Sequence, residues 1–183
     1  MLRKSTFLAV LIITLLNPIA KADDYIKREF RAIWLTTVWG IDWPSTTGTS
    51  SSAQTAQKNQ MIAYLDQLEQ ENFNAVCFQV RSMCDAMYNS KYEPWSSYLT
   101  GSRGSNPGWD PLAFVVEECH KRGMECHAWV NPFRFSTGSA WNTTQDQQLK
   151  NNGWLLSYND GSKTTTILTP GIPEARKRIV DVC

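Results

Sequence analysis

The sequence predicts an α/β protein, specifically the first three βα units of a (β/α)8 TIM barrel. Three β-prone, mostly apolar stretches each precede an amphipathic helical pattern, which is typical of a parallel sheet with right-handed crossovers. The connections after strands are long, whereas those after helices have two or three residues. Barrel enzymes show this asymmetry because their active sites are built from loops at the carboxyl ends of the strands.

The first unit begins with an expected strand over residues 27–37, which is mostly apolar from Phe30 onward. A loop rich in Ser, Thr and Gly is expected over 45–52. A helix is expected over about 55–71, because its apolar residues recur on one face. These residues are Met61, Ile62, Leu65 and Leu68.

The second unit has an expected buried strand over 74–81 and a long loop over 82–109. Asp110 and Pro111 then predict the start of a helix, because Asp caps helix amino termini and Pro favours the first helical position. Gly123 predicts the end of that helix, since Gly readily adopts the left-handed conformation found there.

The third unit has an expected strand over 124–130, a long loop over 131–171 and a helix that begins at Pro173. The expected inner side of this helix carries Ala175, Ile179 and Val180. A doubly wound sheet is the alternative fold, but no Gly-x-Gly-x-x-Gly motif follows the first strand. A complete barrel needs about 250 residues, so we expect a truncated, partial barrel.

Residues 1–22 predict a secretory signal peptide. Two basic residues precede a short apolar run over 7–16, and Ala-Lys-Ala at 20–22 is a small-x-small cleavage site. The run is shorter than the roughly 20 residues that span a bilayer, so we expect no stable membrane span. An uncleaved anchor is the alternative. The prediction is cleavage after Ala22 and export to the periplasm or the extracellular space.

The charge balance argues against a nucleic-acid partner. The chain has 18 Lys and Arg and 17 Asp and Glu, and three of the basic residues lie in 1–22, so the remainder has a net charge of −2. It has no basic stripe of the kind that nucleic acids require. The five cysteines form no Cys-x-x-Cys pair, and we therefore expect neither a metal site nor a redox motif. No cofactor is indicated.

Polar residues at the ends of the second and third strands are candidate sugar contacts. Gln79 and Arg81 share one side of the second strand, where buried polar groups need a partner such as substrate or a carboxylate. A structural ion pair is the alternative for Arg81. His127, Trp129 and Asn131 share one side of the third strand, expected to face the barrel interior. His127 is either a sugar or carboxyl contact or a satisfied core residue.

Three further candidates lie in loops that follow strands. Arg134 reaches from the loop after the third strand. Trp39 and Trp43 flank Asp42 after the first strand, and aromatic faces stack on the apolar C–H faces of sugars. Asp85, just past the second strand, is the best catalytic carboxylate among these residues. The alternative for Asp85 is a turn or cap residue.

Four long segments resemble the glycosyl-hydrolase-like 10 domain of bacterial family 10 glycosylhydrolase-like proteins: 28–45, 74–101, 108–134 and 168–182. The resemblance implies that residues 23–183 are the N-terminal part of a TIM-barrel domain that acts on glycans. Some members resemble enzymes that cut peptidoglycan glycan strands stripped of peptides. In this family an acidic segment follows on the fourth strand, so the resemblance places the main catalytic carboxylates beyond Cys183.

The expected function is hydrolysis of O-glycosyl bonds in a polysaccharide, with peptidoglycan glycan strands as a candidate substrate. This chain alone is expected to lack part of the catalytic site and to be inactive. A non-catalytic glycan-binding module is the alternative of a different class. A metal-dependent polysaccharide deacetylase is a weaker alternative, because it needs clustered His and Asp ligands and the chain has two His.

Overall fold

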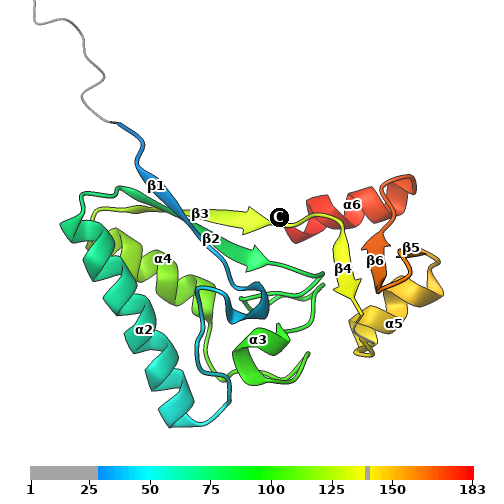
Figure 1. The fold of residues 1–183 in the computed structure, drawn as a ribbon, viewed down its shortest axis with the longest axis horizontal. Coiled ribbons are helices and arrows are strands. Elements are labelled where there is room, and N and C mark those ends of the chain that lie inside the picture. Colours follow the sequence, from blue (N-terminus) through cyan, green and yellow to red (C-terminus); the bar gives the residue numbers. More distant parts are fainter. Residues whose placement is uncertain (1–28, 139–140) are drawn as a thin grey trace, which may run out of the picture.

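The computed structural model describes residues 29–138 and 141–183. The predicted signal peptide over 1–22 and the first residues of the expected first strand lie outside the described residues. Within the described part, no helix combines the length and apolarity needed to cross a membrane. Figure 1 shows a sheet with two long helices beneath it, followed by a smaller region that contains further strands and helices.

Three parallel strands form the main sheet, in the order β1-β2-β3. They are β1 (Ala32–Leu35), β2 (Ala75–Arg81) and β3 (Glu125–Val130). The parallel pairing confirms the predicted strand–helix–strand crossovers. The mixed α/β architecture is thus as predicted, and a sheet of this kind is compatible with the first part of a barrel.

The first crossover helix, α2 (Ser51–Gln70), begins earlier than predicted. Its start lies in a polar stretch that we interpreted as a loop. The Ser50 side chain caps the helix by accepting a hydrogen bond from the backbone N–H of Ala53 at 3.2 Å. Met61 and Leu65 on its inner face are fully buried, as the helical spacing predicts.

The second crossover helix, α4 (Pro111–Lys121), begins at the predicted residue. The Asp110 carboxylate accepts a hydrogen bond from the N–H of Ala113 at 3.0 Å, which satisfies one of the free donors of the first turn. Gly123 follows with a φ of 67° and turns the chain into β3. The short helix–strand connection keeps α4 packed directly against the sheet.

The main hydrophobic core lies between the sheet and these two helices. Val76, Phe78 and Val80 alternate along β2 and face the helices, so one face of the central strand is wholly buried. The opposite face of the sheet carries Trp34 of β1 and Trp129 of β3, whose rings meet edge to face at 4.9 Å. Trp34 is 62% exposed, because no described helix covers this side.

The prediction of a long loop over 131–171 is wrong. This segment folds into β4 (Arg134–Thr137), α5 (Thr144–Asn151), β5 (Leu155–Asn159) and β6 (Thr164–Leu168). The three strands form an antiparallel sheet in the order β4-β6-β5, which we call the small sheet. Two sequence signals marked it: a capping box at the start of α5 and an Asn-Asp-Gly turn between β5 and β6.

Three further helical segments complete the described chain. A 3-10 turn, η1 (Val38–Gly40), follows β1, and a short helix, α3 (Ser97–Thr100), lies in the predicted loop after β2. The last helix, α6 (Pro173–Val182), begins at Pro173 as predicted. Its Val180 is 74% exposed, so the prediction that this residue faces inward is wrong. Ala175 is buried in a second core and Ile179 packs against it, as predicted.

The second core lies under the small sheet. It is separate from the main core and joins residues of β4, β6, α5 and α6 with one residue of the loop after β2. Its buried members are Cys84, Phe135, Leu149, Leu168 and Ala175.

Candidate functional site

Trp39 and Arg134 lie together at the carboxyl end of the main sheet, and we call them the rim pair. Trp39 lies in η1 just after β1 and is 58% exposed. Its φ of 58° is rare for a bulky residue, and such backbones cluster at functional sites. The guanidinium of Arg134, at the start of β4, lies 4.8 Å from the centroid of the Trp39 ring. The pair combines an exposed aromatic ring with a planar set of hydrogen-bond donors.

Gln79 lies at the end of β2 and is buried. Its side-chain oxygen accepts hydrogen bonds from the backbone N–H groups of Thr37 and Val38, both at 2.9 Å. The Thr37 hydroxyl donates to the Gln79 carbonyl, also at 2.9 Å. Gln79 therefore holds the turn that carries Trp39 in place.

Arg81 is the last residue of β2 and is fully buried. Its guanidinium donates to the carbonyls of Asn131 at 2.5 Å and Pro132 at 3.1 Å, and to Glu93 Oε1 at 3.0 Å. Burial opposes the charge, whereas Cys84 and the Glu93 carboxylate favour it, and the pKa of Arg81 lies above its ordinary value. Arg81 thus forms a structural ion pair, which was the alternative to a sugar contact, and its partner is Glu93.

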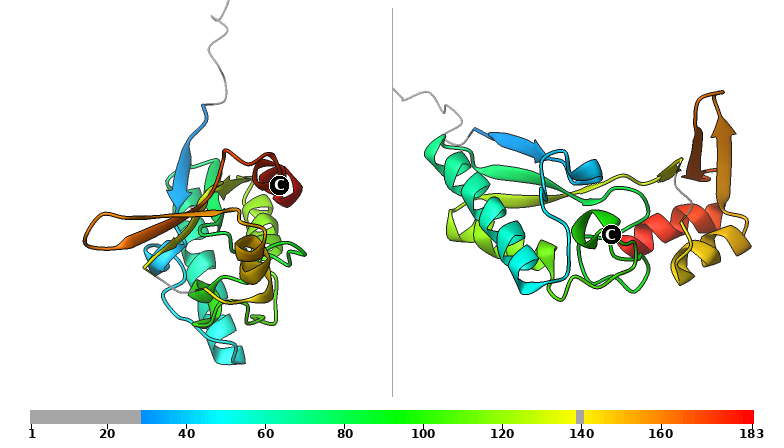
Figure 2. Two further views of the ribbon diagram at one scale, coloured as in Figure 1. Left: turned by 90° about the vertical axis from the view of Figure 1, so that its right-hand side faces the viewer. Right: turned by 60° about the horizontal axis from the view of Figure 1, so that its bottom comes forward.

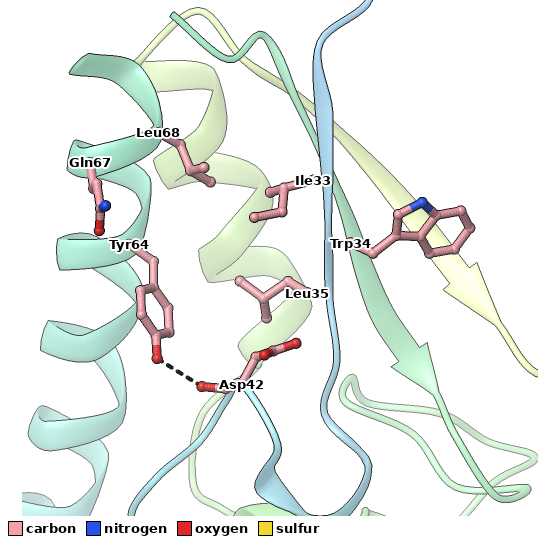
Figure 3. A pocket seen from close by; sticks show the side chains of 7 residues that line it. All are labelled: Ile33, Trp34, Leu35, Asp42, Tyr64, Gln67 and Leu68. Carbon is pink, nitrogen blue, oxygen red and sulfur yellow. Dashed lines mark hydrogen bonds between the residues drawn. The ribbon is translucent and has the colours of Figure 1, made fainter. Parts of the chain in front are cut away.

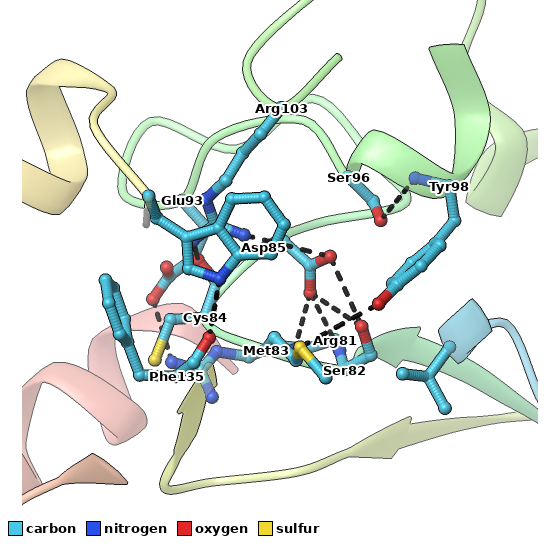
Figure 4. Close-up of polar contacts among 12 residues, drawn as sticks. Arg81, Ser82, Met83, Cys84, Asp85, Glu93, Ser96, Tyr98, Arg103 and Phe135 are labelled. Carbon is cyan, nitrogen blue, oxygen red and sulfur yellow. Dashed lines mark hydrogen bonds and ion pairs between the residues drawn. The ribbon is translucent and has the colours of Figure 1, made fainter. Parts of the chain in front are cut away.

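Glu93 receives a second arginine from the far end of the chain. Arg178 of α6 lies 3.4 Å from the same oxygen and also donates to the carbonyl of Tyr92. The other oxygen, Oε2, is buried and has no hydrogen-bond partner within the described residues. Figure 4 shows the side chains of Arg81, Cys84 and Glu93 close together in this buried region.

Asp85, predicted as the best catalytic carboxylate, is a buried turn residue instead. Its Oδ1 accepts hydrogen bonds from the backbone N–H groups of Ser82 at 3.0 Å and Met83 at 2.7 Å, and the Ser82 hydroxyl donates to it at 3.0 Å. Arg103 lies 4.0 Å from Oδ2. With 2% of its surface exposed, the side chain is inaccessible to a sugar, which corrects the prediction.

Asp42 also closes a turn. Its Oδ2 accepts a hydrogen bond from the N–H of Thr36 at 2.7 Å, and its carbonyl accepts one from the Tyr64 hydroxyl at 3.0 Å. Figure 3 shows Asp42 at one end of a cavity of about 250 Å³ between β1 and α2, lined by Ile33 and Leu35. Ile33 and Leu35 point from β1 toward the helices, whereas the Trp34 side chain points to the other side of the sheet. The cavity therefore lies on the helix side.

A family model described as Glycosyl hydrolase-like 10 matches residues 29–183. The chain belongs to this family. It is similar to glycosyl hydrolase YngK of Bacillus subtilis (strain 168), with 43% identity over 166 residues that cover 87% of this chain and 30% of the relative. It is also similar to glycosyl hydrolase DigH of Escherichia coli (strain K12), with 38% identity over 171 residues, 85% of this chain and 38% of the relative.

These matches confirm the resemblance seen in the sequence. The glycosyl hydrolase-like 10 chain spans about a third of the length of the curated relatives that it matches.

In this glycosyl hydrolase-like 10 domain, β3 carries two of the predicted sugar contacts, His127 and Trp129, on the sheet face that no described helix covers. His127 is exposed and its Nε2 lies 2.8 Å from Glu125 Oε2. The Trp129 indole donates to Asn131 Oδ1 at 2.9 Å, and the Asn131 amide donates to the Ser82 carbonyl at 3.2 Å. His127 and Trp129 line an open hollow of about 300 Å³ with Trp34 and Cys77.

Trp43 was predicted as a sugar platform, and this prediction is wrong. The ring is fully buried in the main core, where it contacts Phe78 and Trp109 edge to face. Its indole N–H donates to the carbonyl of Gln57 at 2.9 Å. A buried indole leaves no face on which a sugar could stack, so of the two tryptophans that flank Asp42 only Trp39 is available.

A polar cluster around Arg103 was missed in the sequence. Arg103 donates to Asp146 of α5 at 2.8 Å and to the Cys84 carbonyl at 2.7 Å, and its guanidinium lies 4.9 Å from the Trp141 ring centroid. It therefore ties the loop after β2 to the small-sheet region. Across the described residues, no group of three or more His, Cys, Asp and Glu is arranged to hold a metal ion.

Proposed function

We propose that this chain forms the sugar-binding part of an exported glycoside hydrolase and binds a polysaccharide strand at the rim pair. The observation that carries the proposal is the exposed Trp39 ring with the Arg134 guanidinium 4.8 Å from its centroid. The ring offers a stacking surface for the C–H face of a pyranose, and the guanidinium offers donors to its hydroxyls.

The carboxylates support a binding role for this part of the chain. Glycoside hydrolysis needs an acid and a second carboxyl group on either side of the scissile bond. Asp42, Asp85 and Glu93 each accept hydrogen bonds from neighbouring protein groups, and Asp85 and Glu93 are buried. We therefore place the acid and its partner on later strands of a longer barrel, where the relatives extend beyond the matched region.

Peptidoglycan glycan strands are the proposed substrate. The predicted signal peptide over 1–22 would bring the protein to the cell envelope, where such strands are abundant, and the family resemblance points to cell-wall glycans. The described residues also lack a basic stripe, which favours an uncharged or weakly charged glycan over a polyanion such as a nucleic acid.

The experiment that tests this proposal is calorimetric titration of the purified chain with peptide-free peptidoglycan strands. We expect measurable binding, and the Trp39→Ala variant should lower the affinity about tenfold, because a stacked aromatic contact is lost. The control is Ile41→Ala, which removes an exposed apolar side chain from the same turn without removing an aromatic ring. No binding by the unaltered chain, or equal loss in both variants, would contradict the proposal.

A non-catalytic glycan-binding protein is the second candidate, favoured by the engagement of Asp42, Asp85 and Glu93 in structural contacts. Release of reducing ends from the same strands separates the two. Hydrolysis by a longer protein that contains this chain supports the enzyme, whereas tight binding without any release by that longer protein supports the binding module.

A further inference from the structure

The small sheet has two faces with different surroundings. On one face, Leu155 and Leu168 pack with Leu149 of α5 in the second core. On the other face, Leu156 of β5 is 56% exposed and Tyr158 is 69% exposed. No described helix packs against these two residues.

The strand register defines which side chains share the open face. Ile167 of β6 lies opposite both Arg134 of β4 and Leu156 of β5. In the next row, Thr165 lies opposite Thr137 and Tyr158. Directly opposite residues of antiparallel strands point to the same side. We call the four residues of β5 and β6 on this face the arm strip: Leu156, Tyr158, Thr165 and Ile167.

The arm strip is continuous with the rim pair. Arg134 of the rim pair links the two, because its guanidinium lies over the Trp39 ring and its backbone pairs with Ile167 of the arm strip. Neighbouring strands lie about 5 Å apart, so Leu156 is roughly 10 Å from Arg134 across the sheet. Tyr158 lies two residues farther along β5. Figure 2 shows that the β5–β6 hairpin projects from the rest of the molecule.

We propose that the arm strip binds additional pyranose rings of the same glycan strand, so that affinity depends on the length of the strand. The inference rests on the proposed function, because it extends the site at the rim pair. One ring on Trp39 cannot reach Tyr158, whereas a strand of several rings passes from the rim pair along Arg134 and Ile167 to Tyr158.

The composition of the strip fits a glycan better than a second copy of this chain. It offers one exposed aromatic ring, two aliphatic side chains and the Thr165 hydroxyl, and Thr137 and Arg134 of β4 lie directly beside it. Alternating apolar faces and hydroxyl donors match the alternating C–H faces and hydroxyl edges of sugars. A standard protein interface uses about 800 Å² and roughly 20–30 residues on each partner, whereas the arm strip has four residues.

The test compares two probes: peptide-free peptidoglycan strands and the disaccharide released from them. Calorimetric titration of the purified chain should show tighter binding of the long strands. Tyr158→Ala should weaken the binding of long strands about three- to tenfold and leave the disaccharide unaffected. Tyr158→Phe, which keeps the ring, should bind as the unaltered chain does. Ser157→Ala is the matched control, since Ser157 lies on the opposite face of the same strand.

The outcomes separate this inference from the proposed function. If Tyr158→Ala binds long strands as tightly as the unaltered chain while Trp39→Ala does not, the proposed role of the arm strip is wrong and glycan binding at the rim pair is supported. If the unaltered chain binds neither probe, both proposals fail. If Tyr158→Ala converts a dimer to a monomer in sedimentation without changing glycan binding, the strip is an interface between copies and the inference is overturned.

Discussion

At Glu93, two arginines from distant parts of the chain meet on one carboxylate oxygen. Arg81 comes from β2 and Arg178 comes from α6. Arg178 lies 85 residues after Glu93 in the sequence. The sequence indicated Arg81 and a carboxylate partner but not which one. Asp85 and Trp43 were mispredicted for the same reason, because their burial depends on partners that no local pattern reveals. The sequence places Trp39 directly after the first strand, and the structure shows it exposed there in η1, while its role as a sugar contact stays a prediction.

The buried ion pair should be costly to break from one side. Glu93→Ala leaves Arg81 charged and buried, and we expect a loss of about 3–5 kcal/mol in the free energy of unfolding. Urea denaturation followed by circular dichroism measures it. Glu117→Ala is the control, because it removes only an exposed ion pair with Lys121 and should hardly move the midpoint. Equal midpoints for the two variants would show that the buried pair contributes nothing.

Helices α2 and α4 are joined by a charged cluster at the end of α4. Arg122 donates to Asp66 of α2 at 2.8 Å and to Glu118 Oε2 at 2.8 Å, and Lys121 donates to Glu118 Oε1 at 2.6 Å. The helix that became α2 was predicted from apolar spacing alone, and α4 was predicted from its capping residues as well. The small sheet was not, because its strands are short and rich in Ser and Thr, and their exposed side chains weaken the alternation on which strand prediction depends.

This cluster predicts a pH dependence of stability. Hydrogen bonds from Lys121 and Arg122 hold the pKa of Glu118 below its ordinary value. The folded state therefore binds this proton more weakly than the unfolded chain does. The stabilisation is present above the ordinary pKa of 4.5 and is lost as the pH falls through the lowered folded value.

Urea midpoints between about pH 3 and pH 7 measure this effect. Glu118→Gln should be less stable than the unaltered chain at neutral pH, and the difference should shrink at the acid end. Glu174→Gln is the control, because this exposed carboxylate in the first turn of α6 makes no hydrogen bond or ion pair within the described residues. A difference that stays constant over the whole range would refute a role for the Glu118 charge.

The whole molecule has one covered and one open side. The helices cover one face of the main sheet, while Phe30 and Trp34 on or beside the other face are each 62% exposed. The outer edges of β1 and β3 carry no further strand among the described residues. Exposed apolar faces and unpaired strand edges both favour association.

We therefore expect the purified chain to associate with itself in a concentration-dependent way. Trp34→Lys places a charge on the open face, on the edge strand β1, and should shift the sedimentation profile toward the monomer. Val180→Lys, on the exposed side of α6, is the matched control and should leave the profile unchanged. A monomer at all concentrations for the unaltered chain would contradict this expectation.

The separate core of the small-sheet region has a consequence for how this fold diversifies. Phe135, Leu149 and Leu168 pack together, so the segment between β3 and α6 has most of its buried residues within itself. Its length and outer face can change through substitution, duplication or exchange while the three parallel strands keep their packing. The outer surface of the segment between β3 and α6 can therefore change without disturbing the packing of β2 against α2 and α4.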